Sequence, residues 1–308
     1  MSHGSGTKAV VAALLANTGI AVTKFAAFLL TGFASMLAES IHSLADAGNQ
    51  LLLLIGGKRS QREATEEHPF GYGRERYIYA FVVAIVLFSI GGVYTLYESV
   101  HKFAELDHLE VDTNRWQSYV PMVVLAVAIV LESLSFRTAI IEGNKSRDGS
   151  TWWQFIRTAK APELPVILLE DFAALMGLVF AFAAVGLTLI THDPVYDVTG
   201  SALIGLLLII VAVVLTVEVK SLLVGESASP ESIRRIRSAL DSAAGLDGVV
   251  HLKTLHIAPE ELLVAAKVAV RPGSLAEDIA AAIDEAEVAV RSAEPMATQI
   301  FLEPDIRR

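Results

Sequence analysis

Residues 198–219 read VTGSALIGLLLIIVAVVLTVEV and contain a single charged side chain, that of Glu218. At a rise of about 1.5 Å per residue, a helix of this length crosses the ~30 Å hydrocarbon core of a bilayer. It is the most uniformly apolar of the long segments in the chain. The stretch therefore predicts a transmembrane helix, and the rest of the chain is interpreted around it.

The composition agrees with a membrane protein. Hydrophobic residues make up 53% of the 308 residues and charged residues 19%, whereas soluble domains are about 25% charged. The formal net charge of −10 argues against nucleic acid as a partner. The absence of cysteine excludes disulfides and thiolate metal sites.

Further apolar segments predict a multi-pass topology. Six segments are long enough to span a bilayer, and they lie at 9–31, 35–57, 77–100, 119–141, 164–191 and 195–222. The loops after the second and fourth segments each hold five Lys or Arg residues, whereas the sequences TGFAS and THDPV on the other side hold none. The positive-inside rule places both termini in the cytoplasm of a multi-pass cell-membrane protein.

The composition changes after Lys220, which indicates a second domain. Ser229 before Pro230 predicts a helix start, and ELLVAAKVAV (261–270) alternates as a strand. The order of predicted elements is α-β-β-α-β, which indicates a small cytoplasmic α+β, ferredoxin-like domain. We expect a transmembrane transport domain at 1–223 and a dimerisation or regulatory domain at 224–308.

The second span carries polar residues that an apolar helix does not need. Glu39, His42, Asp46 and Asn49 are spaced by three, four and three residues, so they lie on one helical face. His42 and Asp46 can both reach one ion, and imidazole with carboxylate suits Zn²⁺ and its first-row neighbours. Ionisable groups at this depth are costly and are typically functional. The alternatives are hydrogen bonds to other helices and, for Glu39, a solvated position near the outer end.

The fifth span supplies a second acidic pair, Glu170 and Asp171, within LPVILLEDFAALMGL. Adjacent helical residues point about 100° apart, so we expect only one of them to face the ion. His42, Asp46 and Asp171, with Glu170 or water, would make a four-coordinate site. A site without sulfur binds metal less tightly and releases it more readily, as a carrier requires.

The remaining polar residues of the spans are assigned to structure. Asn17 and Lys24 lie in the first span and Glu132 in the fourth. We expect Lys24 to snorkel or to pair with an acidic residue.

Three motifs in order resemble the cation diffusion facilitator family. They are AESIHSLADAGNQ (38–50), HPFGYGRER (68–76) and PVILLEDFAALMG (165–177), and the Glu-Asp pair resembles one subgroup. The resemblance implies a homodimer that exports divalent metal from the cytoplasm in exchange for protons. It implies no enzyme activity and no required cofactor.

The resemblance also assigns residues. His42 and Asp46 match the ligand pair of the second span, and Asp171 matches the last acid of the pair in the fifth span. The other ligand position of the fifth span falls on Ile167, which cannot bind metal. Glu170 is the proposed substitute.

Two further metal sites of the family are reduced in this sequence. In the loop after the second span only His68 matches, with Thr65 and Tyr72 at the other two positions. In the C-terminal domain, His251 and Glu303 lie near positions that the family uses, but they fall short of a binuclear site. We therefore expect the C-terminal domain to act mainly in dimerisation.

The sequence thus predicts proton-coupled efflux by alternating access, in which metal binding displaces protons and protonation of His42 aids release. Zn²⁺ is the first choice, with Mn²⁺, Fe²⁺, Co²⁺ and Cd²⁺ open. A metal sensor without transport and a proton-coupled carrier of another substrate are the alternatives. An intramembrane enzyme would need a nucleophile pattern or an H-E-x-x-H helix beside His42, and the sequence has neither.

Overall fold

The computed structural model describes residues 3–106, 116–147 and 149–306. The chain divides into two compact units. The helical unit contains Met1–Lys58 and Tyr77–Val219, and the C-terminal unit contains Arg59–Arg76 and Lys220–Arg308. Residues 59–76 thus belong structurally with the C-terminal segment. The domain boundary between residues 223 and 224 stays a prediction.

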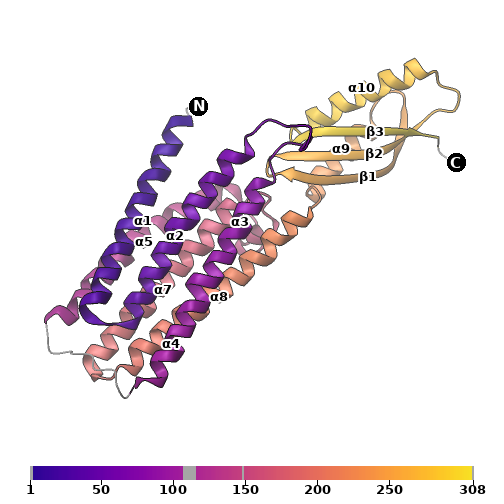
Figure 1. Ribbon diagram of the computed structural model, residues 1–308. Coiled ribbons are helices and arrows are strands. Elements are labelled where there is room, and N and C mark those ends of the chain that lie inside the picture. The colour runs from indigo at the N-terminus through magenta and orange to yellow at the C-terminus, as the bar shows by residue number, and fades with distance from the viewer. Residues whose placement is uncertain (1–2, 107–115, 148, 307–308) are drawn as a thin grey trace. The chain divides into compact units, whose positions relative to one another are not determined.

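The helical unit is built from long helices that run side by side (Figure 1). A π-helical segment, η1, and a 3₁₀ turn, η3, interrupt the α-helical pattern. The elements are α1 (His3–Thr31), α2 (Ala34–Ser60), α3 (Glu75–Val86), η1 (Leu87–Tyr94), α4 (Thr95–Ala104), η3 (Trp116–Tyr119), α5 (Val120–Ser146), α6 (Trp152–Thr158), α7 (Glu163–Thr191) and α8 (Val195–Val224).

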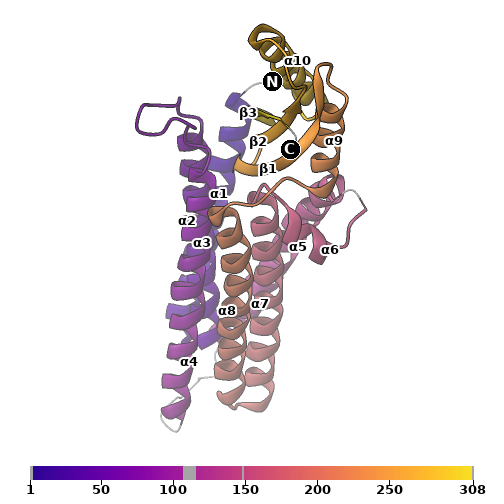
Figure 2. The ribbon, with the colours of Figure 1, turned by 90° about the vertical axis from the view of Figure 1, so that its right-hand side faces the viewer.

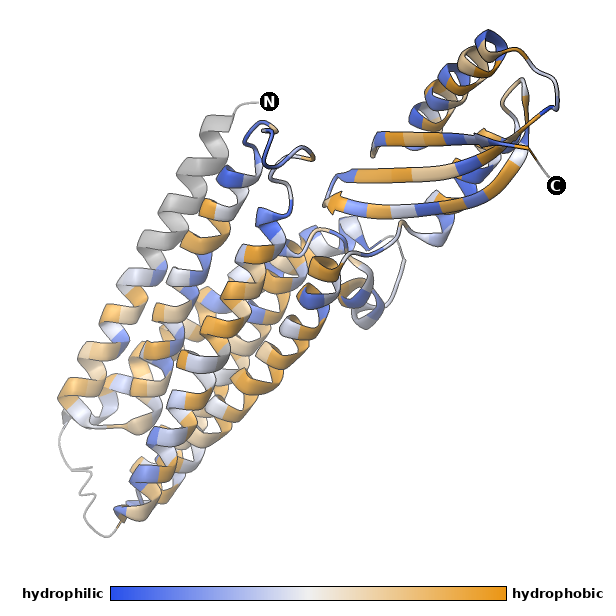
Figure 3. Ribbon diagram, turned by 45° about the vertical axis from the view of Figure 1, so that its right-hand side comes forward, coloured by the Kyte–Doolittle hydropathy of each residue, from blue (hydrophilic) through white to orange (hydrophobic). Residues whose placement is uncertain are grey.

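Four helical stretches of the described chain are long and apolar enough to cross a membrane. They are Glu75–Ala104 (α3, η1 and α4 together), Val120–Ser146, Glu163–Thr191 and Val195–Val224. They coincide with the third to sixth predicted spans, and the hydropathy colouring of Figure 3 shows that hydrophobic residues predominate along them. Helices α1 and α2 form where the first two spans are predicted, although they are not among these four. The polar residues of α2 lower its hydropathy.

Close packing between helices depends on small residues. A Cβ on Gly200 of α8 would lie 2.3 Å from the Cβ of Ala184 on α7, and a Cβ on Gly205 would lie 2.9 Å from the backbone nitrogen of Leu96. Helices α7 and α8 lie side by side (Figure 2). Glycine therefore allows these backbones to approach closely.

The first turn of α8 fixes the start of α2. The carboxylate of Asp197, which is 3% exposed, accepts hydrogen bonds from the backbone nitrogens of Ala34 and Ser35 and from the Ser35 hydroxyl. The first backbone N–H groups of a helix have no partner within the helix. Asp197 supplies that partner from another helix, and its negative charge suits the helix N-terminus.

The C-terminal unit contains α9 (Pro230–Asp241), β1 (Leu246–Ala258), β2 (Glu261–Val270), α10 (Ala276–Ala293) and β3 (Ala297–Asp305). The α-β-β-α-β order and the helix start at Ser229 and Pro230 are confirmed. The sheet order is β1-β2-β3, antiparallel between the first two strands and parallel between the last two. In a ferredoxin-like fold, a further strand lies between the two parallel strands that such a crossover joins. Here β2 and β3 pair directly, so the sheet differs from the predicted ferredoxin-like arrangement.

The two helices and one face of the sheet form the core of this unit. Alternate residues of β2 are buried on that face, among them Leu262, Val264 and Val268, and they pack with Ile236 of α9 and Val290 of α10. The period of two follows from the strand pleat. The other face of the sheet is left uncovered by these helices.

The loop 59–76 packs on the end of this sheet. A Cβ on Gly73 would lie 2.4 Å from the Cβ of Ala258, so only glycine fits there. Nearby, Arg76 Nη1 lies 3.8 Å from Glu260 Oε1. The sequence did not predict that this loop would join the C-terminal unit.

Candidate metal centre

The predicted pair on α2 is present, with His42 buried and the side chain of Asp46 13% exposed. His42 Nε2 lies 3.5 Å from Asp46 Oδ2. His42 is 1% exposed, and neither of its ring nitrogens has a hydrogen-bond partner among the described residues. One oxygen of Asp46, Oδ1, also lacks such a partner. Buried polar atoms are normally hydrogen-bonded, so these atoms are free to bind an ion.

Helix α7 adds a third group through Glu170. Asn49 Nδ2 donates to Glu170 Oε1 at 3.1 Å, and the carboxyl groups of Glu170 and Asp46 are close enough to interact electrostatically. Two carboxylates in contact repel each other unless a proton or a cation lies between them. The space between Asp46 of α2 and Glu170 of α7 therefore favours a bound proton or metal cation.

Asp171 faces in another direction. Its Oδ2 accepts a hydrogen bond of 3.1 Å from the hydroxyl of Ser135 on α5, as expected from the angle of about 100° between adjacent helical residues. Ile167, one turn earlier on α7, is 39% exposed. Of the acidic pair, Glu170 is therefore the residue that lies beside Asp46.

Glu39 is not solvated, in contrast to one of the alternatives above. It is fully buried, and its Oε2 lies 2.8 Å from Lys24 Nζ of α1. Lys24 also donates to the hydroxyl of Ser43 at 2.8 Å. The expectation that Lys24 pairs with an acidic residue is confirmed.

The predicted metal ligands do not form one complete site in this structure. Within residues 3–106, 116–147 and 149–306, no three His, Asp or Glu side chains are grouped closely enough to hold one ion. Simultaneous coordination by His42, Asp46 and Glu170 therefore requires side-chain rearrangement. The pair on α2 and its contact with Glu170 form the starting arrangement.

His68 lies in a turn held by its own side chains. The Thr65 and Tyr72 hydroxyls are 3.3 Å apart, and the His68 and Tyr72 rings pack edge to face with centroids 4.6 Å apart. The Arg62 guanidinium lies over the Tyr72 ring at 4.3 Å. These contacts support a structural role for the turn.

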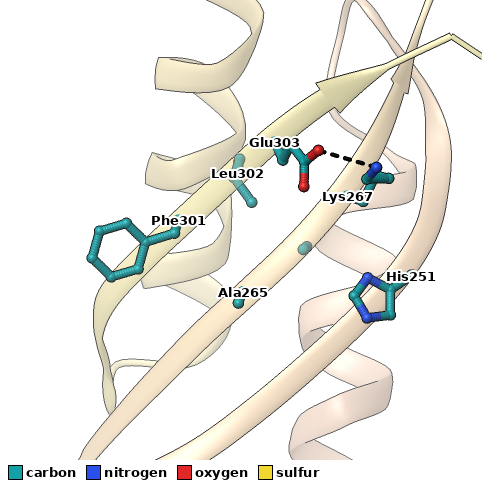
Figure 4. Close-up of a pocket in the computed structure, with 7 residues that line it drawn as sticks. His251, Ala265, Lys267, Phe301, Leu302 and Glu303 are labelled. Carbon is teal, nitrogen blue, oxygen red and sulfur yellow. Dashed lines mark ion pairs between the residues drawn. The ribbon is translucent and has the colours of Figure 1, made fainter.

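His251 lies on the uncovered face of the sheet, in a shallow pocket of about 200 Å³ (Figure 4). Lys267 of β2 lies between it and Glu303 of β3, and its Nζ is 3.0 Å from Glu303 Oε1 and 3.4 Å from Asp305 Oδ2. The hydrogen bond to Glu303 and the two acidic charges raise the pKa of Lys267. The ammonium thus occupies the space where a metal shared by His251 and Glu303 would lie.

Sequence reasoning missed two polar residues that hold α2 in place. Asp197 was not singled out, although an acid in the first turn of an otherwise apolar span is a visible signal. Ser43 is the second such residue, and it accepts a hydrogen bond from Lys24. Its contact with Lys24 has no signal in the sequence, because the two residues lie on different helices.

These observations define a class of protein. Apolar helices of spanning length, with a buried imidazole and carboxylates between them, are the construction of a multi-pass membrane cation transporter. The profile described as "Cation efflux transmembrane domain" matches residues 10–224. The chain belongs to the cation diffusion facilitator (cation efflux) family, which is a family of transporters.

Individual relatives agree with this assignment. The chain is 33% identical over 248 residues to the mouse (Mus musculus) "Proton-coupled zinc antiporter SLC30A9, mitochondrial", covering 80% of this chain and 43% of that protein. It is 28% identical over 260 residues to "Metal tolerance protein C4" of Arabidopsis thaliana, covering 82% and 54%. The chain thus spans about half the length of these relatives.

A solved structure was also matched, a variant of the C-terminal domain of MamM. It is 21% identical and covers 25% of this chain and 92% of its own, with a TM-score of 0.24.

Proposed function

We propose that this protein exports divalent metal cations, Zn²⁺ first among them, in exchange for protons by alternating access. The observation that carries the proposal is the pair of buried His42 and partly buried Asp46, which interacts electrostatically with Glu170 of α7. Imidazole and carboxylate form a donor set that suits Zn²⁺ and its neighbours. The names of the SLC30A9 relatives, proton-coupled zinc antiporters, support zinc as cargo and coupling to protons.

The proposed topology has six spans, with α1 and α2 as the first two. These helices contain 29 and 27 residues, enough to cross a bilayer. The basic loops after α2 and α5 support cytoplasmic termini in the cell membrane. The functional unit is a homodimer that needs no cofactor apart from its cargo.

The contact between Asp46 and Glu170 supports a way to couple metal to protons. Without metal, a shared proton relieves the repulsion between the two carboxylates. Metal ligands must be deprotonated, so binding of a divalent cation at His42, Asp46 and Glu170 releases protons. When the site opens to the other side, reprotonation of these groups displaces the metal. Asp171, which faces α5, stays outside the first coordination set.

The test is metal flux into proteoliposomes under an imposed proton gradient. Zn²⁺, Mn²⁺, Fe²⁺ and Co²⁺ are compared in wild type, in Asp46→Ala and in Glu277→Ala, a control that removes an exposed carboxylate of α10. We expect gradient-dependent flux that is lost in Asp46→Ala and kept in Glu277→Ala. Tight metal binding without flux of any metal would favour the sensor function instead.

A further inference from the structure

Lys24 is a buried cation that the proposed mechanism does not use. It is 3% exposed, and its ammonium contacts both Glu39 and Ser43 of α2 at 2.8 Å. Glu39 and Ser43 are one helical turn apart, and His42 lies between them in the sequence. Lys24 thus holds the turn of α2 that precedes Asp46.

Glu39 would otherwise be placed to bind metal. It lies three residues before His42 on the same face of α2, a spacing at which side chains meet. Its second oxygen, Oε1, has no hydrogen-bond partner among the described residues and lies against Gly177 of α7, where a Cβ would be 2.6 Å away. The ion pair with Lys24 is therefore the main polar contact that holds this carboxylate away from His42.

We propose that Lys24 determines the strength of the metal site by keeping Glu39 out of the coordination sphere. This inference rests on the proposed function, in which His42 and Asp46 bind the transported cation. With Glu39 engaged, the cation has one carboxylate fewer and is released readily. With Lys24 removed, Glu39, His42 and Asp46 would form a three-ligand site along one helix, and such a site would retain its ion.

The charge of Lys24 acts in the same direction. It interacts electrostatically with both His42 and Asp46, and a fixed positive charge near a cation site lowers its affinity for cations. A purely structural ion pair would predict the opposite result. Removing one partner of a buried pair destabilises the fold, which would weaken metal binding or leave it unchanged.

The experiment titrates purified full-length protein with Co²⁺ and records both affinity and the visible absorption spectrum, which reports the ligand set. The variants are Lys24→Met, Glu39→Gln and the double variant. We expect Lys24→Met to bind Co²⁺ at least ~10-fold more tightly, the size of change that outer partners of metal sites produce, with an altered spectrum. The double variant should return to the wild-type spectrum and lose this gain. Glu39→Gln alone should keep the wild-type spectrum.

The inference is overturned if folded Lys24→Met binds Co²⁺ no more tightly than wild type, or if neither protein binds it. A changed spectrum in Glu39→Gln would also overturn it, because Glu39 would then be a ligand in the wild type. That arm can overturn the inference even if Lys24→Met does not fold. Binding is measured independently of flux, so wild type that binds Co²⁺ without moving it would refute the transport function while leaving this test intact.

Discussion

Two aspartates of the helical unit, Asp197 at the N-terminus of α2 and Asp46 within α2, differ in how their oxygens are used. Asp197 accepts three hydrogen bonds at the N-terminus of α2. Asp46, within α2, keeps one oxygen without a partner among the described residues and lies beside a histidine whose nitrogens are also unpartnered. Fully hydrogen-bonded buried acids stabilise a fold, whereas unpartnered ones indicate a ligand.

The difference follows from the source of the hydrogen-bond donors. Backbone N–H groups at a helix end are fixed in position, so they hold the Asp197 side chain in one conformation. The neighbours of Asp46 are side chains, His42 and Glu170, which can rearrange around a cation or a proton. A transport site needs such alternatives, and a structural cap does not. The predictions below test this distinction.

The largest effect is expected for Asp46→Ala. It removes a proposed ligand, so we expect metal flux to fall at least ~100-fold, more than loss of an outer partner of a metal site causes. The melting temperature of the detergent-solubilised protein should stay unchanged or rise, because an incompletely hydrogen-bonded acid has been removed. A large drop in melting temperature would place Asp46 with Asp197 as a structural residue.

The acidic pair of α7 provides a matched comparison. Glu170→Gln keeps the shape and the contact with Asn49 but removes the charge, and we expect metal affinity to fall ~10–100-fold. Asp171→Asn, whose side chain faces Ser135, should change affinity by less than ~3-fold on the same scale. Zn²⁺ titration measures both. The reverse order would restore Asp171 as the ligand that the family resemblance implies.

Asp197→Ala should act on stability alone. It leaves buried donors at the start of α2 unpaired, which costs about 1–3 kcal/mol of the free energy of unfolding. Chemical denaturation in detergent measures the loss, and Zn²⁺ titration of the folded fraction should give wild-type affinity. A weakened site in well-folded protein would show that Asp197 controls the position of His42 and Asp46.

Ser35→Ala is the mildest form of the same change. It removes only the hydroxyl donor and keeps both backbone donors to Asp197, so we expect a loss of about 0.5–1.5 kcal/mol. The denaturation midpoint should lie between those of wild type and Asp197→Ala. A loss as large as that of Asp197→Ala would mean that the hydroxyl, rather than the helix N-terminus, dominates the cap.

Much of the architecture could be predicted from local sequence. Apolar length located four of the proposed spans, and the strand alternation with the Ser229–Pro230 helix start gave the α-β-β-α-β order. The spacing of His42 and Asp46 placed them together because both lie on one helix. Each of these inferences depends on contacts within a few residues.

Contacts between helices could not be predicted in the same way. Whether Glu170 or Asp171 faces α2 depends on the rotation of α7, which no periodicity of its apolar residues specifies. The cap of α2 by Asp197 joins residues more than 160 positions apart. The sequence allowed the expectation that Lys24 pairs with an acidic residue, but it did not identify Glu39 as the partner, because several acids lie in neighbouring spans.

The packing of Gly73 against Ala258 has a consequence for biosynthesis. The C-terminal unit is assembled from two segments of chain, and the first of them, Arg59–Arg76, leaves the ribosome long before the second, Lys220–Arg308. Domains generally fold as units when their last residues have been made. The connection between α2 and α3 can therefore make its contact with Ala258 only after most of the chain has been translated.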